Sequence, residues 1–134
     1  MTAKDYLKQA YFIDRRIKAK ERQLEALKAH AVYSAPQISG LPHGSVSCKS
    51  VMEESALKIM ELEQYINEQI QELVRLKKEI ASVIKAINNP EYETILEMRY
   101  LSFMSWDEIQ YQMEYSQRYM FKIHGLALEM VRVP

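Results

Sequence analysis

An apolar repeat in the middle of the chain limits its fold more than any other feature. Between residues 51 and 88, apolar side chains recur at alternating steps of three and four, with Gln69 as the one polar member. The apolar members are Ile59, Leu62, Ile66, Leu73, Leu76, Ile80, Val83 and Ile87. This spacing keeps them on one side of an α-helix, as in a coiled coil. The pattern predicts a helix over 51–88, roughly 57 Å long, that needs a partner to cover its apolar side.

The first segment of the chain carries the same repeat and predicts another helix, over residues 3–31. Its members are Ala10, Ile13, Ile17, Lys20, Leu24, Leu27 and Ala31. Residues 32–49 contain two prolines and two glycines without a helical period, which predicts a linker. Ser50 and Glu53 have the spacing of a capping box, so the long helix is expected to begin after Ser50. We therefore expect an all-α fold, with a long coiled-coil helical hairpin over residues 1–89.

The long helix is expected to bring copies of the chain together. Ile70 and Ile84 widen its apolar stripe beyond one coiled-coil seam. A wider stripe favours a bundle of more than two helices. We therefore expect a homo-oligomer, in which Gln69 sets the register or the number of partners.

The outer side of the first helix carries a basic stripe at steps of four and three. Its members are Lys4, Lys8, Tyr11, Arg15, Lys18 and Arg22. One interpretation is a solvated face of a coiled coil, because basic helix faces are common. The other is a contact surface for nucleic-acid phosphates or an acidic partner, with Arg15, Lys18 and Arg22 as the candidate phosphate contacts.

Charge is unevenly placed along a chain whose formal net charge is zero. Residues 1–31 carry eight Lys and Arg against four Asp and Glu, whereas residues 90–134 carry four against seven. Cys48 is the only cysteine, so a reduced, cytoplasmic setting is expected. No apolar run approaches the ~18 residues of a membrane span, and the N-terminus lacks a signal-peptide core. We therefore expect a soluble protein without a membrane partner.

The sequence shows no arrangement typical of an enzyme. Its three histidines, His30, His43 and His124, lack a nearby carboxylate and nucleophile. There is no glycine-rich phosphate loop and no H-E-x-x-H motif. His43 and Cys48 have no further ligand at metal spacing. We expect no catalytic residue, cofactor, metal or small-molecule substrate, and we expect His124 to pack or contact a partner rather than ionise.

The last third of the chain predicts three short helices joined by tight turns. Asn89 precedes Pro90, a favoured helix start, and Ser105 and Glu108 form a second capping box. Ser116 supplies a third cap just after the second helix. The apolar positions suit a small trihelical core: Ile109, Met113, Met120, Ile123, Ala127 and Leu128. Residues 90–134 are therefore expected to form a helix-turn-helix domain.

These helices resemble the helix-turn-helix of sigma-70-type factors, their region four. The residues I-L-E-M-R-Y-L (95–101) resemble the helix before the motif, and S-W-D-E-I-x-x-x-M-x-Y-S (105–116) resembles its supporting helix and turn. The residues S-x-x-x-M-x-x-I-x-x-x-A-L (116–128) resemble the recognition helix. A coil followed by this motif is similar to phage and prophage late-transcription regulators of the ArpU-like and RinA-like type. The resemblance implies a DNA-binding regulator that works near RNA polymerase.

If the third helix enters the major groove of double-stranded DNA, its first turns hold the contact residues. The candidates are Ser116, Gln117, Arg118, Tyr119, Phe121 and Lys122. Arginine can pair with guanine, glutamine with adenine, and phenylalanine can meet a thymine methyl group.

Two other functions remain open. One is a small terminase subunit that recognises viral DNA for packaging. The other is a coiled-coil adaptor without DNA contact, in which Tyr119 and Phe121 cover an interface with the coil.

Overall fold

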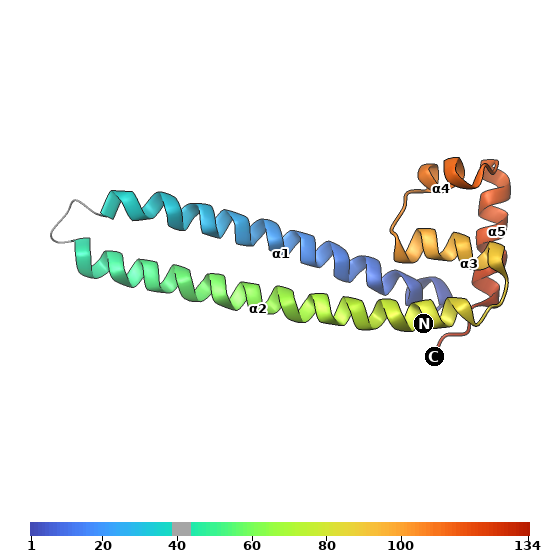
Figure 1. Ribbon diagram of the computed structural model, residues 1–134, viewed down its shortest axis with the longest axis horizontal. Helices are drawn as coiled ribbons and strands as arrows, with labels where there is room; N and C mark the ends of the chain where they lie inside the picture. The colour runs from blue at the N-terminus through green and yellow to red at the C-terminus, as the bar shows by residue number, and fades with distance from the viewer. Residues whose placement is uncertain (39–43) are drawn as a thin grey trace. The chain divides into compact units, whose positions relative to one another are not determined.

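A computed structural model describes the backbone of residues 1–38 and 44–134, and the side chains of residues 1–32 and 52–134. Within these residues the chain is all-helical and contains no strand (Figure 1). The predicted all-α class is therefore confirmed. The elements are α1 (Ala3–Ile38), α2 (Gly44–Lys85), α3 (Pro90–Leu96), η1 (Glu97–Leu101), α4 (Trp106–Met113) and α5 (Gln117–Met130).

The chain forms two compact units. The first unit combines Met1–Asp14 with Glu72–Pro134, and the second contains Arg15–Gln71. Helices α1 and α2 each contribute to both units. The first unit crosses the predicted boundary at residue 89, because the start of α1 and the end of α2 belong to it. The division into functional domains 1–89 and 90–134 stays a prediction.

Both long helices extend further into the predicted linker than the sequence indicated. Helix α1 continues to Ile38 instead of ending near residue 31, and α2 begins at Gly44. Ser50 therefore lies inside α2 and does not cap its start. A capping pattern expresses only a local preference, and a serine is tolerated within a helix when its neighbours are helical. Residues 39–43 of the predicted linker lie outside the described residues, as does the side chain of Cys48.

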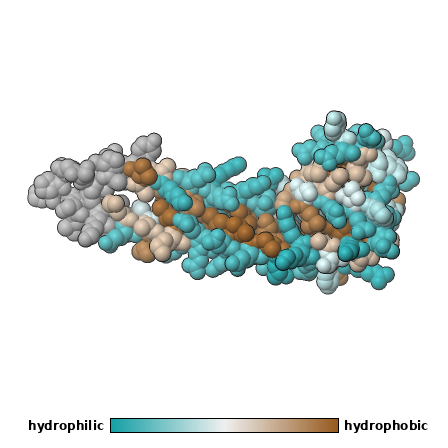
Figure 2. All heavy atoms as spheres, in the orientation of Figure 1, coloured by the Kyte–Doolittle hydropathy of each residue, from teal (hydrophilic) through white to brown (hydrophobic). Residues whose placement is uncertain are grey.

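In the second unit, α1 and α2 lie against each other along the predicted apolar seams. Ile17 and Ile66 are buried, while other seam residues remain half-buried: Leu24, Leu27, Ile59 and Leu62. The ammonium group of Lys20, the polar member of the α1 seam, lies 5.6 Å from the centre of the Tyr65 ring, a cation–π contact. Lys28 and Glu63 form an exposed ion pair at 3.9 Å. Figure 2 shows apolar side chains along α1 and α2, which the pairing leaves partly uncovered.

The core of the first unit joins the C-terminal helices to the start of α1 and the end of α2. Leu7 and Ala10 come from α1, and Ile80 and Ile84 come from α2. The C-terminal segment adds Ile95, Leu96, Tyr100, Ile109, Met120, Ile123, Ala127 and Val131. All of these side chains are at most 9% exposed. Burial of this continuous apolar surface fixes the C-terminal helices on the two long ones.

Helix α2 ends at Lys85, three residues before the predicted position. Asn88 has a positive φ of 57°, a conformation that asparagine tolerates better than most residues. Asn89 then caps α3, since its side-chain oxygen accepts hydrogen bonds from the amides of Glu91 (3.1 Å) and Tyr92 (3.3 Å). Pro90 occupies the first position of α3, so the predicted start of this helix is confirmed.

The backbone between α3 and α4 contains two features that the sequence did not indicate. Helix α3 widens into the π-helical turn η1, which ends with the Ser102 amide donating to the Glu97 carbonyl at 2.9 Å. Phe103 then adopts a φ of 56°. Neither a π-turn nor a bulky residue at positive φ follows from propensity, because both depend on tertiary packing.

Candidate nucleic-acid interface

Two serine caps and a left-handed residue set the geometry of α4 and α5. The Ser105 hydroxyl accepts a hydrogen bond from the amide of Glu108 (3.2 Å), and the Ser116 hydroxyl accepts one from the amide of Tyr119 (3.1 Å). Glu114 ends α4 with a φ of 57°. Only residues 114–116 separate the two helices. The predicted caps Ser105 and Ser116 are confirmed, and α5 follows α4 after a short turn.

The side of α4 and α5 that faces the core is mainly the one that the apolar positions of the sequence predicted. Ile109, Met120, Ile123 and Ala127 are at most 4% exposed. Met113 and Leu128, which were also expected in the core, are only half-buried. This packing fixes which side of α5 faces outward.

The outer side of α5 exposes the predicted DNA-contact residues. Gln117, Arg118 and Lys122 are exposed, as is Ser116 at the cap. Arg118 and Lys122 are four residues apart and therefore project from the same side of the helix. They are the only Lys or Arg residues between Arg99 and Arg132. The exposure agrees with the sequence-based expectation, whereas contact with DNA stays a prediction.

Tyr119 is tied to α3 instead of projecting freely. Its hydroxyl donates to the carboxylate of Glu91 at 3.3 Å, and its ring meets Tyr115 edge-on with 4.7 Å between ring centres. The hydroxyl of Tyr115 donates to the same carboxylate at 2.5 Å, and this bond raises the pKa of Tyr115 to about 12. Sequence reasoning missed Glu91, because no motif connects it with tyrosines 24 and 28 residues away.

Phe121 packs partly against α4. Its ring meets Trp106 edge-on at 5.1 Å, and 41% of its surface remains exposed. The guanidinium of Arg99 lies 4.4 Å from the centre of the same Trp106 ring. Phe121 therefore packs against α4 and Tyr119 against α3. The alternative in which both residues cover an interface with the coiled coil stays a prediction.

His124 lies on the inner side of α5. It is 7% exposed, and its Nε2 atom lies 2.8 Å from the Tyr100 hydroxyl. Its ring also meets Trp106 edge-on at 4.6 Å. Burial, followed by the nearby charges of Lys4 and Arg99, lowers the pKa of His124 to about 4. The imidazole is therefore neutral at pH 7 and serves packing, as expected from the sequence.

The predicted basic stripe of α1 is divided between the two units. Lys8 and Tyr11 belong to the first unit, while Arg15, Lys18 and Arg22 belong to the second. These last three are exposed. Their exposure suits both interpretations, a solvated face and a phosphate contact.

The described residues contain no group of three or more His, Cys, Asp or Glu side chains that could hold a metal ion. No helix within the same residues has the length and apolarity needed to cross a membrane.

Helix α5 exposes both cationic and aromatic side chains, and the family comparison covers the part of the chain that holds this helix. Residues 49–131 match the family described as Protein of unknown function (DUF1492). This match covers more than half of the chain, and the chain belongs to that family. No curated protein and no solved structure matches the chain.

Proposed function

We propose that this chain is a DNA-binding transcription regulator, of the phage type that its C-terminal segment resembles. The exposed side of α5 carries the proposal, because it presents Arg118 and Lys122 together one helical turn apart. Helices α4 and α5 act as a helix-turn-helix, with α5 as the recognition helix in the major groove. The core contacts of Met120 and Ile123 hold that helix with its cationic side outward.

Each exposed side chain of α5 has a chemistry that suits DNA. Arg118 pairs with the acceptor atoms of a guanine, and Gln117 pairs with an adenine. Lys122 holds a phosphate, which positions the helix without reading sequence. The amides at the start of α5 attract a second phosphate, next to the Ser116 hydroxyl. The half-exposed ring of Phe121 meets a thymine methyl group.

A binding titration tests these roles separately. A duplex selected from a randomised pool is compared with a scrambled duplex of the same composition. We expect Arg118→Ala to cost ~1–3 kcal/mol on the selected duplex and to relax specificity at one base pair. Lys122→Ala should weaken binding to both duplexes alike. The control is Lys78→Ala, which removes an exposed lysine from α2. Unchanged affinities for both α5 variants would refute DNA reading by this helix.

The proposal includes a homo-oligomer formed through α1 and α2. The support is the incomplete burial of the seams in the second unit, where Leu24, Leu27 and Leu62 stay half-buried. A second copy would cover them and would double the number of DNA-contacting helices. We expect sedimentation equilibrium at micromolar concentration to show an assembly larger than one chain. A monomer at that concentration would exclude assembly through the coil.

A protein-contact module is the second candidate function. It is favoured by the contacts of Tyr119 with Glu91 and of Phe121 with Trp106, which engage two of the predicted DNA-contact residues inside the protein. In that case α5 would bind RNA polymerase or another protein. The outcome that supports it is an unchanged affinity for both duplexes when Arg118 or Lys122 is replaced by alanine.

A further inference from the structure

A small aromatic pocket lies beside the start of α1, and none of the predicted DNA-contact residues lines it. Its volume is about 140 Å³, and it is lined by Lys8, Tyr11, Phe12, Arg99, Tyr100 and Phe103. Sites for drug-sized ligands usually measure roughly 300–1,000 Å³. This pocket is therefore suited to one inserted side chain and not to a whole cofactor.

Two unusual backbone conformations build this pocket. Arg99 and Tyr100 lie in the π-helical turn η1, and Phe103 has a φ of 56°. Single π-turns occur frequently at functional sites, and a bulky residue at positive φ carries a conformational cost. Both irregularities deliver side chains to the same pocket. Packing of the core alone does not require η1 and Phe103 to border an open pocket. We therefore interpret the pocket as a binding site.

The pocket is cationic and keeps an exposed aromatic rim. Lys8 and Arg99 line it, and the ammonium group of Lys77 lies 4.7 Å from the centre of the Phe103 ring. Among the residues that the structure describes, no acidic side chain lines it. Phe12 is 60% exposed and meets Tyr11 edge-on with 5.8 Å between ring centres. A matching group is therefore an aromatic side chain surrounded by carboxylates.

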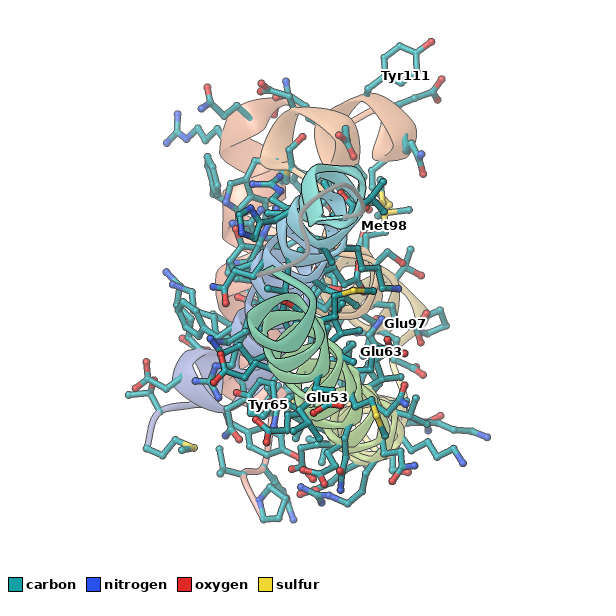
Figure 3. All side chains as sticks on the ribbon, turned by 90° about the vertical axis from the view of Figure 1, so that its left-hand side faces the viewer. Glu53, Glu63, Tyr65, Glu97, Met98 and Tyr111 are labelled. Atoms are coloured by element: carbon teal, nitrogen blue, oxygen red, sulfur yellow. The ribbon has the colours of Figure 1, made fainter. Side chains whose placement is uncertain are left out.

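The same protein carries such a group on α4. Tyr111 is 86% exposed, and Figure 3 shows its side chain pointing away from the helix. Asp107 and Glu108 are exposed and lie four and three residues before Tyr111 on α4, which places them beside it on the helix surface. Glu114, also exposed, follows at the end of α4. A large aromatic side chain that is 86% exposed adds little to the packing of its own chain, and here it is accompanied by acidic side chains.

We propose that Tyr111 of one copy inserts into the aromatic pocket of a second copy of this chain. Its carboxylate neighbours then lie against Lys8 and Arg99 of that copy. The opposite charges of the two surfaces set the orientation and exclude the pairing of two pockets or two Tyr111 groups. Because the two surfaces are different patches, the same contact can repeat from copy to copy along DNA. This association is separate from assembly through the coil and from base reading by α5.

Photo-crosslinking of the full chain tests the contact directly. A benzophenone amino acid replaces Tyr111 in an unlabelled chain, which is mixed with a chain labelled with heavy isotopes and intact at position 111. We expect crosslinked pairs of one light and one heavy chain, with the attachment mapped to residues 8–12 or 99–103 of the heavy chain. The absence of such pairs, or attachment only at other sites, would overturn the proposal.

Two exposed substitutions test the energetics without disturbing the core. Phe12→Ala empties the rim of the pocket and Tyr111→Ala removes the inserted group. Each should lower the association constant of this step at least about tenfold, as expected for an aromatic anchor. Association is followed by the crosslink yield in the first case and by sedimentation velocity in both. Met130→Ala, which removes an exposed apolar side chain from the end of α5, is the matched control and should change nothing.

Mixing the variants distinguishes this contact from every other kind of association. A chain with Tyr111→Ala keeps an intact pocket, and a chain with Phe12→Ala keeps an intact Tyr111. An equimolar mixture should therefore form pairs that neither variant forms alone. Charge exchange gives a second check, since Asp107→Lys should be rescued by Lys8→Glu. If the association of the mixture equals the average of the two variants alone, the contact is refuted. It is also refuted if Tyr111→Ala weakens DNA binding but leaves association of the chains unchanged.

Discussion

Lowering the pH from 7 to 5 should destabilise the first unit through His124. Its imidazole is 7% exposed and lies 2.8 Å from the Tyr100 hydroxyl. Burial lowers its pKa from 6.5 to about 4 in the folded chain. Between these two values the unfolded chain binds a proton that the folded chain does not. Protonation therefore favours unfolding, and stability falls as the pH drops from about 6.5 towards 4.

The size of the effect follows from the difference between the two pKa values. A shift of one unit corresponds to ~1.36 kcal/mol, so the full loss is about 3 kcal/mol, reached below pH ~4. At pH ~5 most of the unfolded imidazole is charged, and the loss relative to pH ~7 is about 2 kcal/mol. Above pH ~7 this group should contribute no further change. For a chain of 134 residues, a loss of this size is a substantial part of the total stability.

Urea unfolding at several pH values, followed by circular dichroism, measures this loss. The control is His124→Gln, because a glutamine amide can still bond to the Tyr100 hydroxyl and cannot be protonated. The wild-type chain should lose about 2 kcal/mol more than the variant between pH ~7 and ~5. Carboxylates titrate in both proteins, so their contribution cancels in the comparison. The chemical shifts of the His124 ring protons should also stay constant until the pH falls below about 5.

An equal loss in both proteins would refute the reasoning. It would mean that the imidazole is charged in the folded chain, or that water reaches it. A titration of the His124 ring near the ordinary histidine pKa of ~6.5 would contradict the lowered pKa directly, without any measurement of stability.

Two substitutions in and beside α5 test the packing and the turn. Met120→Ala should cost ~2–5 kcal/mol in urea unfolding, because Met120 is 1% exposed in the core, whereas Met130→Ala, at a 52% exposed position, should stay within about 0.5 kcal/mol. A small effect of Met120→Ala would mean that α5 packs with another side inward. Glu114→Gly should stabilise the chain by up to ~1 kcal/mol, because glycine adopts the φ of 57° without strain. Lys78→Gly, at an exposed position in the interior of α2, should instead destabilise by ~1 kcal/mol, and a loss at both positions would contradict the assigned turn.

The sequence was most informative where a feature depends on neighbouring residues. Asn89, Ser105 and Ser116 cap helices as expected, since a cap needs only the amides two or three positions ahead. The seams of α1 and α2 also follow from local spacing, and Ile17 and Ile66 are buried where the repeat places them. Helix ends were less predictable, because a serine such as Ser50 can start a helix or lie within one.

The aromatic pocket lay beyond sequence reasoning. Lys8 and Tyr11 were placed on an outward basic stripe of α1, yet both line a pocket with residues about 90 positions further along the chain. The π-turn that presents Arg99 breaks the helical period on which sequence patterns depend. The hydrogen bond from Tyr115 to Glu91 was also not predictable from the sequence, because only the packing of α5 against α3 brings these two residues together.

The charge of the C-terminal segment limits how a DNA complex could form. Residues 90–134 carry four cationic and seven acidic side chains, so one copy attracts DNA weakly. If Arg118 and Lys122 both met phosphates, one copy would give a logarithmic salt slope of only about −2, and two copies would give about −4. Adding Arg15, Lys18 and Arg22 would steepen the slope by about 3 per copy if each met a phosphate. The measured slope would therefore report how many copies bind together and whether the basic stripe of α1 takes part.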